Sequence, residues 1–295
     1  MFRLHKIGIL TDSTNDLPEE FIESREYLFT IPLTLHFGDE QYIDGIDIGS
    51  AEFFDKIEKE DTIPTTSQPS AGRFIEKYQE MAEDYDQIIS IHISGQLSGT
   101  VKSAQLAAQD IENAEIKIID TGSASLGLGT IVKLACKLVE EEKVFTEIAD
   151  IIDAHLSKST VLFTVSDLKF LEKGGRIGKA QSFLGSILNF HPLLELKAVE
   201  GEITPNGRAR GKKRVKDAIV EYCRGWLQGE KYAWIGIMHG NNPERADEIK
   251  SALEDLCQEM DVELEIIENI ISPILGAHVG PSVYGMALLT GDSLK

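Results

Sequence analysis

The chain is poor in cysteine and in positive charge. Its 295 residues include three cysteines, which are far apart and form no CxxC pair: Cys136, Cys223 and Cys257. This spacing excludes a disulfide scaffold and suits a reducing compartment. Lysine and arginine together number 29 against 49 aspartates and glutamates, which gives a formal net charge of −20. Because so acidic a surface repels nucleic acid and anionic membranes, we expect neither as a partner.

The sequence also lacks long apolar runs. No stretch approaches the roughly 18 consecutive apolar residues of a transmembrane helix, so we expect no stable membrane insertion. The first ten residues, MFRLHKIGIL, contain one short apolar run that leads directly into TDST, unlike a secretory signal peptide. These features indicate a cytoplasmic protein.

Motifs of common catalytic sites are missing as well. There is no GxSxG elbow of an α/β-hydrolase, no HExxH zinc motif and no Walker A loop, and the seven histidines are scattered. The segment GLGT at 127–130 lacks the third glycine of a dinucleotide-binding fingerprint, which favours a role in helix packing. We therefore assign no catalytic residue, no metal ligand and no cofactor to this chain.

In the first half of the chain, apolar runs alternate with helical patterns. Strands are predicted at 6–14, 27–38, 86–93 and 116–121, and helices at 50–60, 69–85, 98–110 and, as two segments, 125–157. Such alternation is typical of an α/β unit with a largely parallel sheet. In these sheets, ligands bind beyond the carboxyl ends of the strands.

The second half of the chain has a different pattern of predicted strands and helices. Strands are predicted at 159–164, 232–240, 262–269 and 283–290, a hairpin at 193–211 turning at Glu200-Gly201, and helices between them, one of them near 181–190. Because the hairpin is antiparallel, this sheet should be mixed. The length of the chain suits two domains. We therefore predict an α/β protein with two α/β domains, residues 1–158 with a largely parallel sheet and residues 159–295 with a mixed sheet.

A polar turn follows the predicted strand at 86–93. The segment HISGQLSGT, residues 92–100, places two glycines and two serines between this strand and the next helix. Free backbone N–H groups and a helix N-terminus make such a turn a candidate site for an anion. Ser94 and Ser98 have an alternative role as helix caps, which is the favoured role for Ser98. Two roles are open for Asp12 and Ser13, after the first strand: capping a helix, which is favoured, or closing the pocket. His239 is interpreted as a turn histidine.

Six short motifs occur in a fixed order along the chain. They are ILTDSTNDLP at 9–18, TTSQPS at 65–70, SGQLSGT at 94–100, LEKGGRI at 171–177, GRARGKK at 207–213 and GAHVGP at 276–281. Together they closely resemble the DegV family, whose members bind long-chain fatty acids. Several members are binding subunits of a bacterial fatty-acid kinase. The resemblance spans nearly the whole chain.

The resemblance implies that one fatty acid, such as palmitate or oleate, lies between the two domains. By motif, its carboxylate would meet Thr66, Ser94, Gly95 and His278. Many members of the family have a second serine where this chain has Gly95, so one hydroxyl contact is lost while the backbone N–H stays. The resemblance further implies that a separate kinase subunit brings ATP and Mg²⁺ and converts the bound acid to an acyl-phosphate.

The residue types at these positions suit a carboxylate. A buried carboxylate needs several hydrogen-bond donors to remain ionised, and hydroxyl, imidazole and backbone N–H groups supply them. Uncharged donors hold the acid without the clamp of an arginine pair, which suits a carboxylate that must react. The alternative is a stand-alone enzyme acting on a small phosphorylated or carboxylated metabolite in the same cleft. A long apolar tunnel would favour lipid binding, and a short polar cleft would favour the enzyme.

A basic run interrupts the acidic chain between positions 203 and 216. It contains Arg208, Arg210, Lys212 and Lys213, followed by two more cations, and no acid. One interpretation is a solvated face beside a helix start. Positive charge at a helix N-terminus opposes the macrodipole, however, so stability does not explain it. The second interpretation is a docking site for an acidic partner or for phosphate groups. Arg176, in KGGRIG, is interpreted as a solvated helix end.

Overall fold

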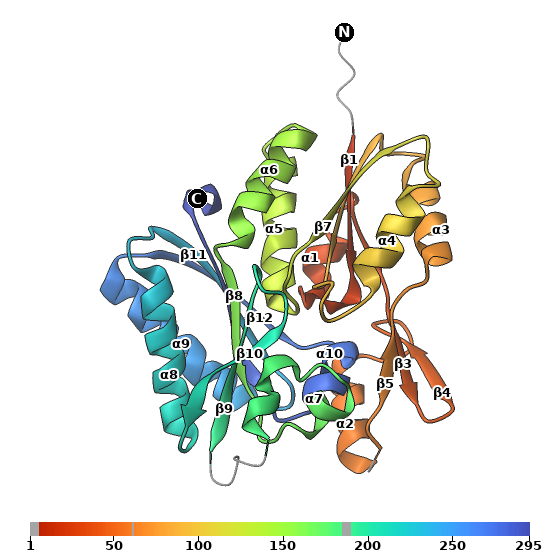
Figure 1. The fold of residues 1–295 in the computed structure, drawn as a ribbon. Helices are drawn as coiled ribbons and strands as arrows, with labels where there is room; N and C mark the ends of the chain where they lie inside the picture. The colour runs from red at the N-terminus through yellow and green to blue at the C-terminus, as the bar shows by residue number, and fades with distance from the viewer. Residues whose placement is uncertain (1–5, 61, 185–189) are drawn as a thin grey trace.

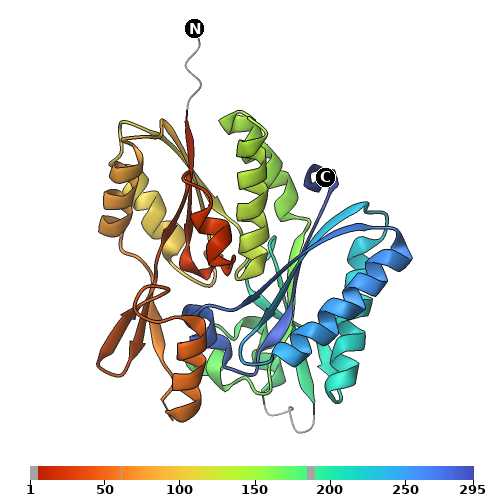
Figure 2. The ribbon, with the colours of Figure 1, turned by 180° about the vertical axis from the view of Figure 1, so that it is seen from behind.

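The computed structural model describes residues 6–60, 62–184 and 190–295. Two large sheets stand side by side with helices between and outside them (Figure 1). Figure 2 shows the same arrangement from behind. The predicted α/β class, with one parallel and one mixed sheet, is confirmed. The predicted division after residue 158 stays a prediction; it falls in the short connection between α6 and β8.

The first sheet is parallel throughout. Its four strands run in the order β2-β1-β6-β7, and their bounds are β1 Ile7–Asp12, β2 Leu28–Ile31, β6 Gln87–His92 and β7 Glu115–Asp120. Alternate residues of β1 and β6 enter different cores. Leu10 and Ile88 pack under helices α3 (Ala71–Met81) and α4 (Thr100–Ala108), whereas Ile9 and Ile89 belong to the core on the other face. The carboxyl ends of all four strands meet at one edge.

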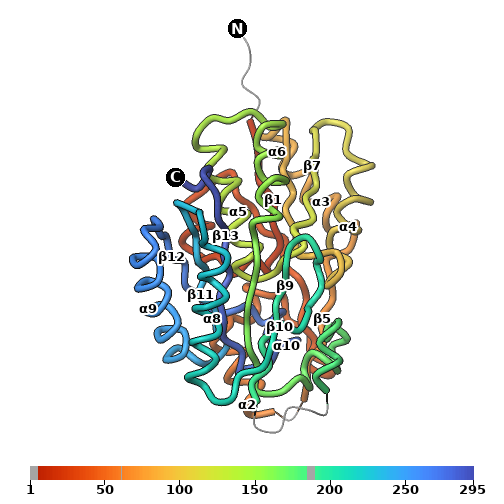
Figure 3. Tube along the Cα trace, turned by 60° about the vertical axis from the view of Figure 1, so that its left-hand side comes forward, coloured from red at the N-terminus to blue at the C-terminus, as the bar shows by residue number. Residues whose placement is uncertain are grey.

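The second sheet has six strands in the order β10-β9-β8-β13-β11-β12. Their bounds are β8 Ser159–Thr164, β9 His191–Lys197, β10 Ile203–Ala209, β11 Tyr232–His239, β12 Glu263–Ile270 and β13 Tyr284–Thr290. Only β11 and β12 pair in parallel, and β9 and β10 form the predicted hairpin. Helices α8 (Lys212–Leu227) and α9 (Pro243–Met260) lie side by side over its outer face (Figure 3).

Helix α5 (Leu126–Glu140) packs against strands of both sheets, with α6 (Phe145–Leu156) beside it (Figure 1). Eleven of its residues are buried, and glycine makes the close packing possible. A Cβ on Gly127 would collide with Val161 of β8, and a Cβ on Gly129 would collide with the carbonyl of Asn15. The predicted packing role of the segment 127–130 is therefore confirmed.

The run at 27–38, predicted as one strand, is two strands in different sheets. Pro32 separates β2 from β3 (Thr34–Phe37). A proline has no N–H for a sheet ladder, so the chain leaves the first sheet there. A small antiparallel sheet follows, in the order β4-β3-β5, with β4 at Glu40–Ile43 and β5 at Thr65–Ser67.

The shorter helices complete the region between the two large sheets. They are α1 (Glu19–Glu23), α2 (Ser50–Lys59), α7 (Lys169–Lys173), α10 (Pro273–Val279) and the 3₁₀ helices at Ser13–Asn15, Gly178–Phe183 and Asp292–Leu294. Helix α10 contacts α2, α7 and the small sheet, so it joins the two halves of the chain. Half of the helix predicted near 181–190 lies outside the described residues, and its first three positions belong to the 3₁₀ helix Gly178–Phe183. No helix in the described part of the chain has the length and apolarity required to cross a bilayer.

Candidate functional site

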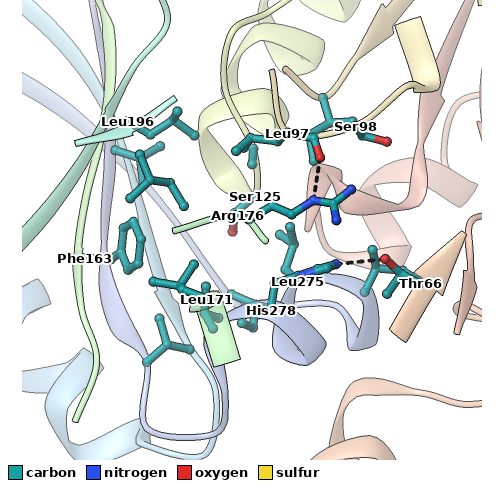
Figure 4. A pocket seen from close by; sticks show the side chains of 18 of the residues that line it. Thr66, Leu97, Ser98, Ser125, Phe163, Leu171, Arg176, Leu196, Leu275 and His278 are labelled. Atoms are coloured by element: carbon teal, nitrogen blue, oxygen red, sulfur yellow. Dashed lines mark hydrogen bonds between the residues drawn. The ribbon is translucent and has the colours of Figure 1, made fainter. Parts of the chain in front are cut away.

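A cavity of about 380 Å³ lies between the two large sheets and the small sheet (Figure 4). Pockets for small ligands commonly measure roughly 300–1,000 Å³. Its walls come from both halves of the chain: β5, the turn after β6, the start of α5, strands β8 to β11, and α10. The fold therefore places the cavity beyond the carboxyl end of β6, where the parallel sheet predicts a ligand site.

Most of the cavity wall is apolar. The aliphatic and aromatic residues that line it are Leu33, Ile93, Leu97, Ala124, Val161, Phe163, Leu171, Leu196, Ile203, Met238, Ile271, Ile274, Leu275, Val279 and Val283. The polar lining residues are fewer: Thr66, Ser67, Gln68, Ser98, Ser125, Arg176 and His278. A ligand for this space would have a long apolar part and a small polar group.

Thr66 and His278 meet at the cavity although they are 212 positions apart. The hydroxyl oxygen of Thr66, on β5, lies 2.8 Å from Nε2 of His278, in the last turn of α10. Gly174 allows the approach, because a Cβ there would collide with the imidazole. The sequence suggested both residues as parts of one site, and the structure brings them together. Their role in holding a carboxylate stays a prediction.

The imidazole of His278 is neutral at physiological pH. Burial, assisted by the nearby positive charge of Arg176, lowers the pKa of His278 to about 4. Its Nδ1 is buried and has no hydrogen-bond partner. A neutral imidazole has one N–H donor and one acceptor nitrogen. An anion entering beside it would gain a donor and would favour protonation of the ring.

Arg176 is exposed just beyond the end of α7, as its interpretation as a solvated helix end predicts, and it also lines the cavity. Its Nε donates to the carbonyl of Leu97 at 3.0 Å, and Nη1 donates to the carbonyl of Gly174 at 2.7 Å (Figure 4). The guanidinium therefore joins the turn after β6 to the loop after α7. It is the only fully charged side chain among the described residues that line the cavity. Its position gives this end of the cavity a positive potential.

Ser94 and Gly95 do not line the cavity. The buried hydroxyl of Ser94 donates its single proton to the carbonyl of Gly201 at 2.5 Å. The N–H of Gly95 donates to the carboxylate of Asp120 at 3.1 Å. Both donors are thus occupied in the structure, and contact with a ligand requires these bonds to open. Their suggested role at a carboxylate stays a prediction.

The neighbouring Ser98 lies between the start of α4 and the cavity. Its hydroxyl oxygen accepts from the N–H of Thr100 at 3.3 Å, at the start of α4, and the residue lines the cavity. The N-cap of α4 is Gly99, however, and it has no side-chain cap, so Ser98 contacts the start of the helix without being its N-cap. Asp12 accepts from the N–H of Thr14 at 3.1 Å and caps a 3₁₀ turn. His239 bonds to the carbonyl of the next residue at 2.7 Å, as a turn histidine.

A row of serine, histidine and aspartate lies inside the first sheet. The hydroxyl of Ser90 is 2.6 Å from Nε2 of His92, whose Nδ1 is 3.1 Å from Oδ2 of Asp12. The order of contacts matches that of a hydrolytic triad. All three side chains are fully buried, and none lines the cavity. The Ser90 hydroxyl is also bonded to the hydroxyl of Tyr78. The row therefore links β1 to β6 and presents no nucleophile to a substrate.

The described part of the chain contains no group of three or more histidine, cysteine or acidic residues placed to hold a metal ion. The basic run lies away from the cavity lining. Arg208 and Arg210 are exposed on and beside β10, and Lys212 and Lys213 are exposed at the start of α8. Among the residues that the structure describes, none of these four forms an ion pair with an acid. The guanidinium of Arg208 stacks 4.3 Å from the ring of Phe183.

Two buried carboxyl groups have pKa values far above the usual range. Burial raises the pKa of Asp16 to about 7, although hydrogen bonds from Ser125 and Ser272 oppose the rise. Burial also raises the pKa of Asp44 to about 7, opposed by a hydrogen bond from Ser13 and assisted by the charge of Asp12. One oxygen of the Asp44 carboxyl group has no hydrogen-bond partner. Both groups favour the protonated form in the folded state.

These two groups should make the protein more stable as pH falls from 8 to 6.5. The folded state holds more protons than the unfolded state between the ordinary pKa of 3.8 and about 7, so its stability decreases as pH rises through that range. Each group should contribute on the order of 1 kcal/mol between these two pH values. Asp44→Asn should remove its share of the difference. Urea unfolding of both proteins at both pH values measures it, and equal pH dependence would contradict the assignment.

The fold and the cavity define an α/β protein that encloses a mostly apolar, ligand-sized space between two sheets. A family model described as an uncharacterised protein of the DegV family matches residues 6–291. The chain belongs to the DegV family. A DegV domain-containing protein of Deinococcus radiodurans is 34% identical over 286 residues, which cover 96% of this chain and 98% of the relative.

Solved structures of the family share the fold. A DegV family protein from Thermus thermophilus, described as binding fatty acid, superposes with a TM-score of 0.88 at 36% identity and covers 97% of this chain and 100% of its own. DegV from Bacillus subtilis, described as a fatty acid binding protein, gives a TM-score of 0.87 at 28% identity, with coverage of 97% and 100%. The predicted membership in the DegV family is therefore confirmed.

Proposed function

We propose that this protein binds one long-chain fatty acid, such as palmitate or oleate, in the cavity between the sheets. The observation that supports this most directly is the composition of the cavity: a long apolar wall with Thr66 and His278 hydrogen-bonded to one another among its few polar residues. Fatty-acid binding by the similar proteins of Thermus thermophilus and Bacillus subtilis supports the same ligand class.

The carboxylate would lie beside Thr66 and His278. Thr66 can donate its hydroxyl proton, and His278 can donate an N–H in either protonation state. The positive charge of Arg176 lies in the same lining and would favour an anion there. Ser94 and Gly95 remain proposed contributors, provided that their bonds to Gly201 and Asp120 open when the ligand binds.

The apolar tail would supply most of the affinity. Burial of a methylene group contributes roughly 0.8 kcal/mol, so about fourteen methylenes contribute on the order of 11 kcal/mol before the costs of association. The apolar side chains of Val161, Phe163, Leu196 and Met238, all on strands of the second sheet, are suited to this part of the ligand. A small phosphorylated or carboxylated metabolite would leave this wall without a partner, which favours the lipid over the stand-alone enzyme.

We further propose that the protein is not itself an enzyme and presents the carboxylate to a separate kinase in the cytoplasm. The kinase would supply ATP and Mg²⁺ and form the acyl-phosphate. The basic run, with Arg208, Arg210, Lys212 and Lys213, supports a docking role, since these side chains are exposed on a chain of net charge −20. Strand β10 supplies Arg208 to this run and Ile203 to the cavity wall, so a partner docked here would lie close to the ligand.

Removing a donor from the head-group site should weaken binding. We expect Thr66→Val and His278→Ala each to reduce affinity for oleate by roughly 5- to 150-fold, because loss of a hydrogen bond to a charged group costs about 1–3 kcal/mol. Titration of delipidated protein with oleate provides the measurement. Thr65→Val is the matched control, since Thr65 is exposed on the same strand and outside the cavity lining. Affinity equal to wild type in both cavity variants would remove these residues from the site.

A further inference from the structure

The side chain of the cavity residue Ser125 is hydrogen-bonded to the buried carboxyl group of Asp16, which lies on the other side of the cavity wall. The hydroxyl oxygen of Ser125 lies 2.5 Å from Oδ2 of Asp16, and both residues are almost fully buried. Ser125 lines the cavity (Figure 4), whereas Asp16 lines a second recess, of about 460 Å³. The two residues are 109 positions apart, and they meet where α5 begins beside the end of β1.

The backbone at Ser125 is strained. Its φ of 55° and ψ of −145° lie in a region that essentially only glycine populates. A side chain held in such a conformation costs on the order of 1–3 kcal/mol, and such residues concentrate at functional sites. Glycine would relieve the strain here but would remove the hydroxyl. The presence of serine at this strained position therefore indicates a use for its hydroxyl group.

A serine hydroxyl has one proton. The direction of its O–H bond therefore decides whether Ser125 offers the cavity a hydrogen-bond donor or only acceptor lone pairs. When Asp16 is ionised, Ser125 must donate that proton to the carboxylate and can offer the cavity only lone pairs. When Asp16 is protonated, Asp16 donates to Ser125, and the proton of Ser125 is free to point into the cavity. A ligand carboxylate is an acceptor and can bind only the second arrangement favourably.

We propose that Asp16 sets the direction of the Ser125 hydroxyl, so that binding of a carboxylate ligand is coupled to uptake of one proton by Asp16. This inference rests on the proposed binding of a fatty acid. The proton comes from solvent and binds Oδ2 of Asp16. The new O–H donates to the oxygen of Ser125, and the hydroxyl of Ser125 donates to the ligand carboxylate. No covalent bond of the ligand changes.

The surroundings of Asp16 direct the proton to Oδ2. Its other carboxyl oxygen accepts from the backbone N–H of Ser272 at 2.8 Å, at the N-cap of α10. Its backbone carbonyl accepts from the side chain of Asn269 at 2.9 Å. Asp16 is thus bound to α10, which bears His278, and to the start of α5. Protonation of Oδ2, which is bonded to Ser125, therefore acts directly on a cavity residue.

The charges around Asp16 favour its protonated form near neutral pH. Burial, assisted by the nearby carboxyl group of Asp44 before α2, raises its pKa to about 7. The recess that Asp16 lines is also lined by Glu19 and Glu23 of α1, and His278 of α10 lines the cavity on the side of Ser125. Glu19 and Glu23 are exposed at the recess that Asp16 lines, which gives protons a route from solvent.

Calorimetric titration of delipidated protein with oleate at pH 8, in two buffers of different ionisation enthalpy, measures the protons taken up. The wild type should take up close to one proton per ligand, because Asp16 is largely ionised in the empty protein at this pH. Its affinity should decrease by up to about tenfold per pH unit above pH 7. His278 can also gain a proton beside a bound carboxylate, although its pKa is about 4 in the empty protein; Asp16→Asn keeps His278, so uptake that remains in this variant belongs to another group such as the histidine.

Two variants separate this coupling from a structural role. In the variant Asp16→Asn, the amide oxygen can accept from the N–H of Ser272 and the amide nitrogen can donate to Ser125 at any pH. Asparagine also tolerates the positive φ of 52° at position 16. Asp16→Asn should therefore bind oleate at pH 8 at least as tightly as wild type, with proton uptake near zero. Ser125→Gly should be as stable as wild type or more stable, because it relieves strain, yet it should bind more weakly and take up no proton at pH 8.

The possible outcomes distinguish this inference from the proposed function. Tight binding of oleate by the wild type without proton uptake would overturn the coupling and leave lipid binding in place. Equal uptake in wild type and Asp16→Asn would assign the proton to another group and would also overturn it. Absence of oleate binding by the wild type would contradict the proposed function itself.

Discussion

Replacing Arg208 and Arg210 with glutamate is expected to reduce acyl-phosphate formation with the cognate kinase by at least about tenfold, while the amount of bound lipid stays unchanged. Both side chains are exposed and neither lines the cavity. Arginine forks bind carboxylate and phosphate groups well, and charges at the rim of an interface act mainly on association rate and on its salt dependence. The reversal replaces attraction for an acidic surface with repulsion.

The measurement pairs lipid content by mass spectrometry with turnover by purified kinase at several salt concentrations. Lys59→Glu with Lys102→Glu is the matched control, since it makes the same change in net charge on exposed residues of α2 and α4. The control should keep full turnover. Full turnover by the arginine variant would refute the docking role. Loss of lipid from it would show that stacking of Arg208 on Phe183 supports the cavity wall.

Filling the cavity at Ala124 is expected to reduce fatty-acid occupancy by at least about tenfold. Ala124 is the smallest apolar residue of the lining, so a phenylalanine ring at this position projects into the space that the ligand tail requires. An added ring in a space of fixed shape either excludes the ligand or forces costly displacement of its neighbours. Lipid extracted from Ala124→Phe and from wild type, purified in parallel, provides the comparison.

The control for this substitution is Ala114→Phe. Ala114 is half-buried before β7, outside the cavity lining, so the same enlargement there should leave the lipid content unchanged. Thermal unfolding of both variants tests whether they are folded. Full occupancy in a folded Ala124→Phe protein would show that the fatty acid occupies another part of the molecule.

The two main sheets could be predicted because their strands have strong local signals. Runs such as that of β6, with Ile88, Ile89 and Ile91, are rich in β-branched apolar residues, as is typical of strands buried on both faces of a parallel sheet, and they alternate with amphipathic helices. The small sheet was not predicted, because β3, β4 and β5 are each only three or four residues long and are stabilised by pairing with one another. The proline between β2 and β3 was the available signal.

The site was predictable only in part. Thr66 and His278 were suggested by motifs, but no local pattern gives their separation of 2.8 Å, which depends on how α10 packs between the halves. Helix α10 itself has seven residues and includes Gly276, so its helical pattern is too short to recognise. The sequence predicted the exposed position of Arg176 at a helix end but not its place in the cavity lining. Its hydrogen bond to Leu97 is a long-range contact.

The pair of Asp16 and Ser125 could not be found from sequence at all. Each residue has an ordinary local role, Asp16 in a turn after β1 and Ser125 before a helix. The signal is the backbone conformation of Ser125, which only the structure contains. Ser94 is the opposite case, because a motif suggested it for the carboxylate site and the structure places it outside the cavity lining. Its hydroxyl donates to Gly201 in the hairpin turn of the second sheet, so the turn after β6 contacts a partner that its own sequence does not reveal.

Native mass spectrometry of protein purified without added lipid tests the central claim most directly. The account predicts one fatty acid per chain, of roughly C14–C18, because the tail must match the apolar cavity wall to bind through purification. Organic extraction and analysis of the released lipid would identify it. A mass equal to that of the chain alone, together with no binding of added palmitate or oleate, would contradict the account.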